Sequence, residues 1–290
     1  MSKPELSYKD IGVCIIFFEK LDQTIECIRS VLRTSQLGLP NVYVFNNNSS
    51  PESTKKLKEF CSGHKTVHYF HSDKNIGPSG GRNYMINHSK EKWLLFLDND
   101  IVIRTKSWQK RILRHIQRSS ETEVFVPVLY NKHDFFFCRY DAFQVSEGKL
   151  VSIKRGDKTI NNFPGGASFV NRKLFDRIGL YDPEMFPAFE DVELSIRAMK
   201  MGEEITATKI RDILLIHDHR KAVSNKDKTA TNFRYNNSLN ENCYNRLHSK
   251  YQIDLGNGYL EWANKERDKI LMGVNFFSAL YKFIRGKLPL

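Results

Sequence analysis

The 290-residue sequence has few cysteines and no long hydrophobic run, and each shortage excludes a class of protein. Its five cysteines are odd in number and form no Cys-x-x-Cys pair, which argues against a disulfide-stapled scaffold or a cysteine zinc site. The longest apolar runs, VCIIFF and WLLFL, are far shorter than the roughly 18 residues that cross a membrane. The first ten residues lack the apolar segment of a secretory signal. We therefore expect a protein of the reducing cytoplasm.

Acidic residues are outnumbered by basic ones, 33 to 45, which gives a net charge of +12. The excess is greatest near the C-terminus, where residues 220–290 hold thirteen Lys and Arg against six Asp and Glu. Such a surface favours a polyanionic neighbour, such as anionic lipid or a phosphate-bearing substrate, or is simply a basic soluble surface. Zinc spacing, a recognition helix and an aromatic-basic stretch are all missing, so we expect no nucleic acid partner.

Apolar strand-like segments alternate with amphipathic segments along the first hundred residues. Strands are predicted at 11–18, 41–46, 66–72 and 93–98, with helices at 21–34, from about 51 to Gly63, and, after a loop at 73–83, up to about Ser89. This spacing predicts βαβ units and an α/β fold, with helices flanking a mostly parallel central sheet. Further along, strands are predicted at 122–129 and 212–219, a hairpin around Glu147 and a helix at 189–202. We expect one domain at 1–220 and a basic, mainly helical extension at 221–290.

Polar residues follow each predicted strand of the first half, at the edge of a parallel sheet where ligands collect. Two carboxylates, Asp98 and Asp100, interrupt the apolar stretch WLLFLDNDIVI, and burying them unpaired would be costly. Hard oxygen ligands at a strand end suit Mg²⁺ or Mn²⁺, which often arrives with a diphosphate. The alternative is that both are ordinary turn residues after a strand.

Seven motifs, in order, carry a resemblance to a known family: IIFFEK, VYVFNNNSSPES, NIGPSGGRN, FLDND, FPGGASF, FEDVELSIRAMKMG and LLIHDH. In this order they resemble the family-2 glycosyltransferases of the GT-A fold, over about residues 11–224. The resemblance implies a GT-A domain that moves a sugar from a nucleotide-diphospho-sugar to a hydroxyl of a glycan or lipid-linked acceptor. It further implies inversion at the sugar and a role in surface polysaccharide synthesis.

The same resemblance implies which residues bind the donor. These are Phe18, Glu19, Asn46, Asn48, Asn75, Gly77, Arg82, Asp98, Asn99, Gly165 and Gly166. Asn46 departs from the family, which usually has Asp here; an amide both donates and accepts, so a pyrimidine edge is still readable. A UDP-sugar is favoured, but the base stays open. The residues alone also permit a plain helix-start loop at Asn75–Arg82 and a tight turn at Gly165–Gly166.

The resemblance also implies that Mn²⁺ or Mg²⁺ binds to Asp98, Asp100, His217 and His219. Asp191 is the general base that takes the acceptor proton, and Glu190 orients the acceptor or shares that role. The alternatives are acids that stabilise a helix start and histidines that are structural.

The last residues form an amphipathic stripe of Phe277, Leu280, Tyr281 and Ile284, flanked by basic side chains. It fits peripheral binding to the inner face of a membrane, or packing on the catalytic domain or a second subunit. The functional alternatives are a retaining transferase or nucleotidyltransferase on the same fold, or a non-catalytic basic binding module.

Overall fold

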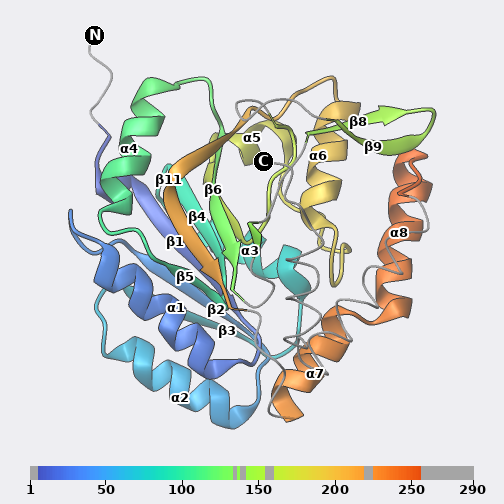
Figure 1. The fold of residues 1–290 in the computed structure, drawn as a ribbon. Coiled ribbons are helices and arrows are strands. Elements are labelled where there is room, and N and C mark those ends of the chain that lie inside the picture. Colours follow the sequence, from blue (N-terminus) through green and yellow to red (C-terminus); the bar gives the residue numbers. More distant parts are fainter. Residues whose placement is uncertain (1–5, 133–135, 138–141, 154–159, 219–224, 256–290) are drawn as a thin grey trace, which may run out of the picture.

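A computed structural model describes residues 6–132, 136–137, 142–153, 160–218 and 225–255 (Figure 1). Among them, nine strands form one large sheet and two form a separate hairpin. The strands of the large sheet are β1 (Ile11–Phe17), β2 (Val42–Asn47), β3 (Val67–Ser72), β4 (Trp93–Asp98), β5 (Ile101–Ile103), β6 (Val124–Asn131), β7 (Phe136–Phe137), β10 (Ala167–Asn171) and β11 (Ala207–His217). The hairpin consists of β8 (Ala142–Ser146) and β9 (Lys149–Ile153).

Helices flank this sheet, and the last of them packs on a flanking helix instead (Figure 1). They are the short 3₁₀ helix η1 (Tyr8–Asp10) and α1 (Leu21–Thr34), α2 (Pro51–Ser62), α3 (Gly77–His88), α4 (Trp108–Arg118), α5 (Lys173–Ile178), α6 (Glu190–Lys200), α7 (Asn225–Arg234) and α8 (Asn237–Tyr251). The predicted helix at 21–34 has the same bounds as α1. Helix α3 begins at Gly77, inside the segment that was predicted as a loop, and helix α4 was not predicted.

The first half of the sheet is parallel, as expected. Its strands lie in the order β3-β2-β1-β4, with Val13 opposite Val42 and Leu95 on its two sides. The second half is mixed: β10 pairs antiparallel with both β4 and β6, and β6 pairs parallel with β11. Strand β5 closes the edge, antiparallel to β11. The predicted α/β fold is thus confirmed, and the antiparallel strand β10 is what makes the sheet mixed.

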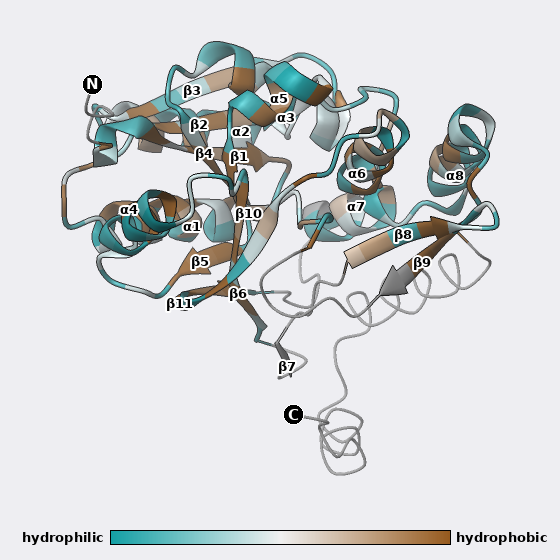
Figure 2. Cartoon of the chain, turned by 90° about the horizontal axis from the view of Figure 1, so that it is seen from above, coloured by the Kyte–Doolittle hydropathy of each residue, from teal (hydrophilic) through white to brown (hydrophobic). Residues whose placement is uncertain are grey.

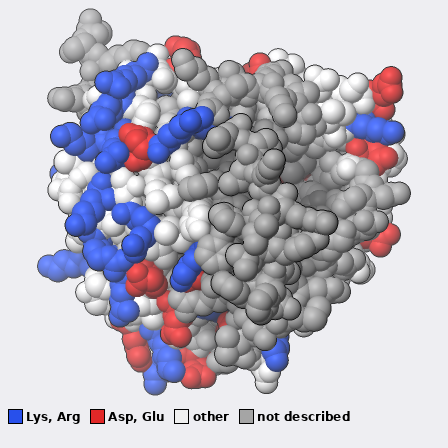
Figure 3. All heavy atoms as spheres, in the orientation of Figure 1, with Lys and Arg blue, Asp and Glu red and all other residues white. Residues whose placement is uncertain are grey.

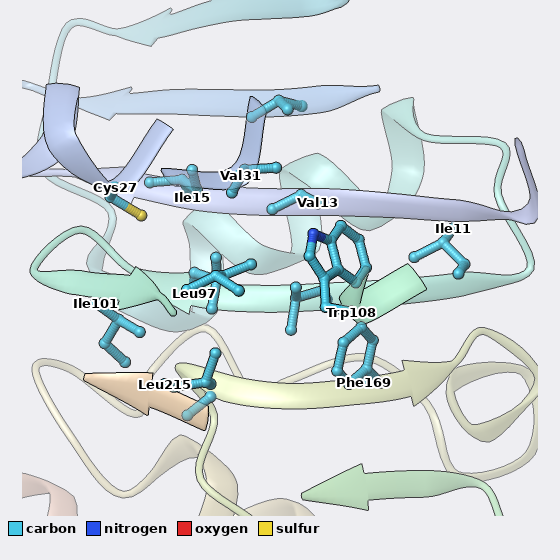
Figure 4. Packing of buried hydrophobic residues seen from close by; sticks show 14 of the residues in the cluster. Ile11, Val13, Ile15, Cys27, Val31, Leu97, Ile101, Trp108, Phe169 and Leu215 are labelled. Carbon is cyan, nitrogen blue, oxygen red and sulfur yellow. The ribbon is translucent and has the colours of Figure 1, made fainter. Parts of the chain in front are cut away.

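Two buried clusters cover the two faces of the sheet. On one face, Val13 and Ile15 of β1 contact side chains from α1, α2 and α4, including the fully buried Trp108 (Figure 4). On the other face, Cys14 packs with residues of α3, α5 and α6. Alternate residues of one strand point to opposite faces, so the continuous apolar run 11–17 is what a strand covered on both faces requires. Figure 2 shows this pattern as hydrophobic strands between helices with hydrophilic outer faces.

A third cluster joins α6 to α8. Met185, Phe189 and Ile196 pack there with Cys243 and Leu247 of α8. The described part of the predicted extension therefore packs against the helix that carries Glu190 and Asp191. The domain boundary at 220 stays a prediction, and both His219 and the amphipathic stripe at 277–284 lie outside the described residues.

The surface is unevenly charged. Lys and Arg side chains gather on the side of the molecule where α1, α2 and α4 lie, and α4 alone contributes Lys110, Arg111, Arg114 and Arg118 (Figure 3). In the part of the chain that the structure describes, no helix is both long and apolar enough to cross a membrane.

Candidate active site

Strand pairing brings the second aspartate and the first histidine together. His217, the last residue of β11, lies opposite Ile101 of β5, so Asp100 comes beside the imidazole. The Asp218 amide donates to the Asp100 carbonyl at 2.9 Å, and Nε2 of His217 is 3.1 Å from Oδ1 of Asp100. Both side chains are buried. Two residues that are 117 positions apart thus form one polar pair at the end of the sheet.

Lys20 lies on the other side of the same carboxylate. Its Nζ is 3.0 Å from Oδ2 of Asp100, and the two side chains are only 17% and 4% exposed. Asn99 fixes this turn, because its Nδ2 donates to the Glu19 carbonyl and to Oγ1 of Thr24 at 3.2 and 3.0 Å. Lys20 was missed in the sequence, although it directly follows Glu19 at the end of a parallel strand. That position was the signal that would have identified it.

Arg82 links the first aspartate to the acidic pair of α6. This buried guanidinium donates to Oε1 of Glu190 through Nη1, and its Nη2 is 3.5 Å from Oδ1 of Asp98. Its Cζ also lies 5.6 Å from the centre of the Tyr181 ring. A planar guanidinium can contact two carboxylates at once, which an ammonium group does less well. The predicted donor-binding Arg82 is therefore between two predicted functional acids.

Two glycines directly before β10, Gly165 and Gly166, allow Arg82 and Asp98 to lie close to the backbone. A Cβ on Gly166 would lie 2.1 Å from the carboxyl carbon of Asp98, and one on Gly165 would lie 3.0 Å from the Arg82 guanidinium. Any side chain at 166 would therefore displace Asp98. The room for a sugar ring that the resemblance implies here stays a prediction.

Asp191 lies in the first turn of α6, next to the glycine segment. Its Oδ2 accepts from the Gly165 amide at 3.2 Å and its Oδ1 from the Val192 amide at 2.8 Å. Burial, and then the negative charge of Glu190, raises the pKa of Asp191 to about 6, while Arg82 and the two amides act in the opposite direction. A carboxylate with a pKa just below neutrality is suited to general base catalysis at pH 7.

The predicted nucleotide side is a network of asparagines after β2 and before α3. Asn46 is fully buried, and its Nδ2 donates to Oγ1 of Thr54 and to the Tyr69 hydroxyl, both at 2.8 Å. Its Oδ1 accepts from the Ser49 amide at 3.0 Å. These hydrogen bonds of Asn46 hold the loop after β2 in shape from the protein interior. Asn48, in the same loop, is exposed and has a φ of 64°.

Asn47, which was not predicted, connects this loop to the next one. Its Nδ2 donates to Oδ1 of Asn75 at 2.8 Å, and its Oδ1 accepts from the Ile76 amide at 2.8 Å. Gly77 adopts a φ of +72°, and a Cβ there would lie 2.4 Å from the Phe186 ring. The loop Asn75–Gly77 is thus held in one shape at the start of α3.

Two residues at the end of β1 have structural partners. The Glu19 carboxylate is buried and accepts from the Ser50 amide at 2.6 Å and from Oγ of Ser53 at 3.2 Å, at the start of α2. Phe18 packs against Phe233 of α7, with ring centres 5.6 Å apart. These contacts give both residues a role in shaping the site, and their predicted contact with the donor stays a prediction.

Helix α7 adds a cation that the sequence did not reveal. Arg234 follows Phe233 and interacts electrostatically with Asp98, Asp100 and Glu190. Desolvation disfavours its charged form, yet Tyr235 and these three carboxylates together raise the pKa of Arg234, a residue that stays exposed to solvent. No local pattern marks Arg234, because its place depends on Phe233 packing against Phe18 and Phe186.

The described candidate ligands would make up part of a divalent metal site. Asp100 and His217 offer a carboxylate and an imidazole in contact, which suits Mn²⁺ or Mg²⁺, and Asp100 already attracts the cation Lys20. Among the described residues, no three His, Cys, Asp or Glu side chains converge into a complete site. Remaining ligands would come from donor phosphates and water, as is usual for such ions.

Comparison with known proteins identifies relatives of this chain. It is 34% identical over 100 residues to an uncharacterized glycosyltransferase of Rickettsia bellii (strain RML369-C), covering 34% of this chain and 14% of that protein. It is 23% identical over 220 residues to the low-salt glycan biosynthesis hexosyltransferase Agl10 of Haloferax volcanii, covering 71% of this chain and 66% of that protein. The chain therefore spans less than two thirds of the length of either relative.

Solved structures share the fold. GalNAc-T7 with UDP, GalNAc and Mn²⁺ matches with a TM-score of 0.58 and 16% identity, over 88% of this chain and 56% of that one. Residues 1–349 of S. aureus TarS match with a TM-score of 0.53 and 12% identity, over 90% and 80%. These likenesses confirm the GT-A fold expected from the sequence. The family model for glycosyl transferase family 2 matches residues 12–179, more than half of the chain, and the protein belongs to that family.

Proposed function

We propose that this protein is a metal-dependent, inverting glycosyltransferase that moves a sugar from a nucleoside diphosphate sugar to a hydroxyl of a glycan or lipid-linked acceptor. One observation carries the proposal: Arg82 bridges Glu190, the neighbour of the candidate base, and Asp98, at the end of the strand that leads to the candidate metal ligand Asp100. The candidate base and the candidate site for a leaving diphosphate are thus linked through Arg82, which supports glycosyl transfer.

Asp191 takes the proton from the acceptor hydroxyl, and the oxygen of that hydroxyl attacks the anomeric carbon. As the new bond forms, the bond from that carbon to the diphosphate oxygen breaks, and its electron pair leaves with the nucleoside diphosphate. A single displacement of this kind inverts the configuration of the sugar. At pH 7 Asp191 is mostly ionised, since its pKa is about 6, so it is ready to accept the proton.

Cationic side chains stabilise the departing diphosphate. Arg82 and Arg234 place fixed positive charge near Asp98, where charge develops on the leaving group. Mn²⁺ or Mg²⁺, when held by Asp100 and His217, supplies further neutralisation of the diphosphate. Glu190 holds the Arg82 guanidinium and so keeps it beside the base.

A UDP-sugar is the favoured donor, because GalNAc-T7, with the same fold, is described with UDP and Mn²⁺. The hexosyltransferase Agl10, named for glycan biosynthesis, favours a hexose and a glycan acceptor. Buried Asn46 shapes the loop in which exposed Asn48 is available to contact the nucleoside. We also retain peripheral attachment to a membrane as part of the proposal for a lipid-linked acceptor.

A thermal-shift screen of UDP, GDP, dTDP and CMP tests the donor and the metal together, each with Mn²⁺, Mg²⁺ or EDTA. A nucleotide at 100 times its Kd should add about 2.7 kcal/mol to the free energy of unfolding. We expect a shift with one nucleoside diphosphate that disappears in EDTA. Equal shifts with and without metal would refute metal dependence, and no shift at all would favour a non-catalytic binding module.

The configuration of the product separates the remaining alternatives. NMR of the transferred sugar should show inversion at the anomeric carbon. Retained configuration would remove Asp191 from the role of base. Release of pyrophosphate from a nucleoside triphosphate supplied with a sugar 1-phosphate would instead identify a nucleotidyltransferase.

A further inference from the structure

We propose that Lys20 acts as an internal cation of the metal site, and that it couples the binding of metal to the binding of the donor diphosphate. In the free enzyme its ammonium group neutralises Asp100; when metal and diphosphate bind together, it moves from the carboxylate to the phosphate. This inference rests on the proposed function, because it concerns the same metal and donor.

The backbone of Lys20 is fixed, whereas its side chain can move. Lys20 has a left-handed conformation with a φ of 54° and precedes α1, where its carbonyl accepts from the amide and from Oγ1 of Thr24, both at 3.0 Å. The Asn99 side chain holds the same turn through the Glu19 carbonyl. Beyond this anchored backbone, a flexible four-carbon stem carries the charge. The ammonium group can therefore change partners without any change in the fold.

The contact between Lys20 and Asp100 should disfavour the binding of metal without a diphosphate. Nζ of Lys20 lies 3.0 Å from one carboxylate oxygen, while His217 lies 3.1 Å from the other. A divalent ion held by Asp100 and His217 would therefore lie close to a buried like charge, which disfavours metal on its own. A diphosphate bound with the metal offers Lys20 a new anionic partner and removes that cost. Metal and donor then bind more tightly together than either does alone.

Two other roles for Lys20 predict different behaviour. If the pair of Lys20 and Asp100 were a permanent structural contact, loss of the charge would lower stability without improving metal binding. If Lys20 replaced the metal altogether, Mn²⁺ would not bind with or without donor. Only an exchangeable internal cation predicts that a neutral residue at position 20 both tightens the binding of metal alone and weakens the coupling between metal and donor.

The test measures Mn²⁺ binding by electron paramagnetic resonance of the free ion, on the full chain without nucleotide. We expect Lys20→Gln and Lys20→Met to bind Mn²⁺ at least about tenfold more tightly than the wild type. Lys20→Arg keeps the charge and should bind as the wild type does. Lys56→Gln is the matched control, because Lys56 also pairs with a carboxylate, at 2.8 Å from Glu52, but on the exposed surface of α2.

Repeating the titration with UDP tests the coupling itself. The factor by which UDP tightens Mn²⁺ binding must equal the factor by which Mn²⁺ tightens UDP binding. We expect this factor to be at least about tenfold smaller in Lys20→Gln than in the wild type. Unchanged Mn²⁺ affinity in both neutral variants, with Mn²⁺ bound by the wild type, would overturn the role of Lys20 alone. Absence of Mn²⁺ binding in all variants, with and without UDP, would overturn metal dependence as well.

Discussion

Replacing Asp191 by Asn should abolish transfer and at the same time stabilise the protein. The folded protein raises the pKa of this carboxyl from 3.8 to about 6, chiefly by burial and then by the charge of Glu190. Such a shift corresponds to about 3 kcal/mol of disfavoured ionisation. Because the side chain is partly exposed to solvent, which screens the interaction, we expect a gain of about 1–2 kcal/mol at pH 7.

The sign of this effect follows from proton binding. Below pH 4 both the folded and the unfolded chain carry a protonated Asp191, so the wild type and Asp191→Asn should have similar stability. Between pH 4 and 6 the unfolded chain loses this proton first, so the wild type loses stability as the pH rises. Above pH 6 the full difference in stability between the wild type and Asp191→Asn remains. The rate of transfer should change in the opposite direction, since the ionised carboxylate is the proposed base, and kcat/KM should fall about tenfold between pH 7 and pH 5.

Thermal unfolding between pH 4 and 8, together with the pH dependence of kcat/KM, checks both halves of the prediction. For a chain of this size about 1 kcal/mol corresponds to a change in Tm of about 2–4 °C. Asp22→Asn is the control, because Asp22 is also the second residue of its helix but is exposed. Loss of its favourable interaction with the helix dipole should lower stability slightly. If Asp191→Asn also lowered Tm and left the acid limb of the pH profile unchanged, Asp191 would be a helix-start residue and not the base.

Two further substitutions test the packing around the site. Gly166→Ala should push Asp98 away and weaken metal-dependent nucleotide binding at least about tenfold in the thermal-shift assay. Gly63→Ala is the control and should have no such effect, because the added Cβ meets only one carbonyl oxygen, at 3.5 Å. Glu193→Ala should lower the free energy of unfolding by about 3 kcal/mol in urea, because the fully buried Glu193 carboxylate accepts from Arg197 of α6 and from Lys250 of α8. The substitution Glu184→Ala, at an exposed carboxylate, should cost less than about 1 kcal/mol, and equal losses would refute a stabilising contact between α8 and α6 through Glu193.

The parallel half of the fold was predictable because the residues of each strand are enough to indicate it. Runs such as IGVCIIF are apolar on both faces and are followed by polar residues, and their spacing leaves room for one helix. The same rule placed Asp98 and Asp100 at the edge of the sheet where ligand binding is predicted. Helix α4 also had a readable signal that was overlooked, since Ile112, Leu113 and Ile116 recur at helical spacing and are buried.

The mixed half was not predictable in the same way. The segment ASFVN reads as a strand, but nothing within it indicates antiparallel pairing between β4 and β6. That pairing is a long-range property, and it places Gly166 against Asp98. Arg234 is a similar case, because only the packing of Phe233 on Phe18 directs α7 toward the acids. Sequence reasoning therefore found the acids and missed two of the cations that balance them.

The balance between these charges gives a reason for metal and donor to enter together. Lys20 and Arg82 contact Asp100 and Asp98 directly, and Arg234 interacts with both of these acids. A divalent ion alone would add positive charge beside Lys20, and a diphosphate alone would add negative charge beside Asp98. A metal–diphosphate pair brings charges that nearly cancel, so it can enter a buried site without upsetting the existing ion pairs. Under the proposed function, a site with its own cations would thus select for the complete metal–donor complex over either part.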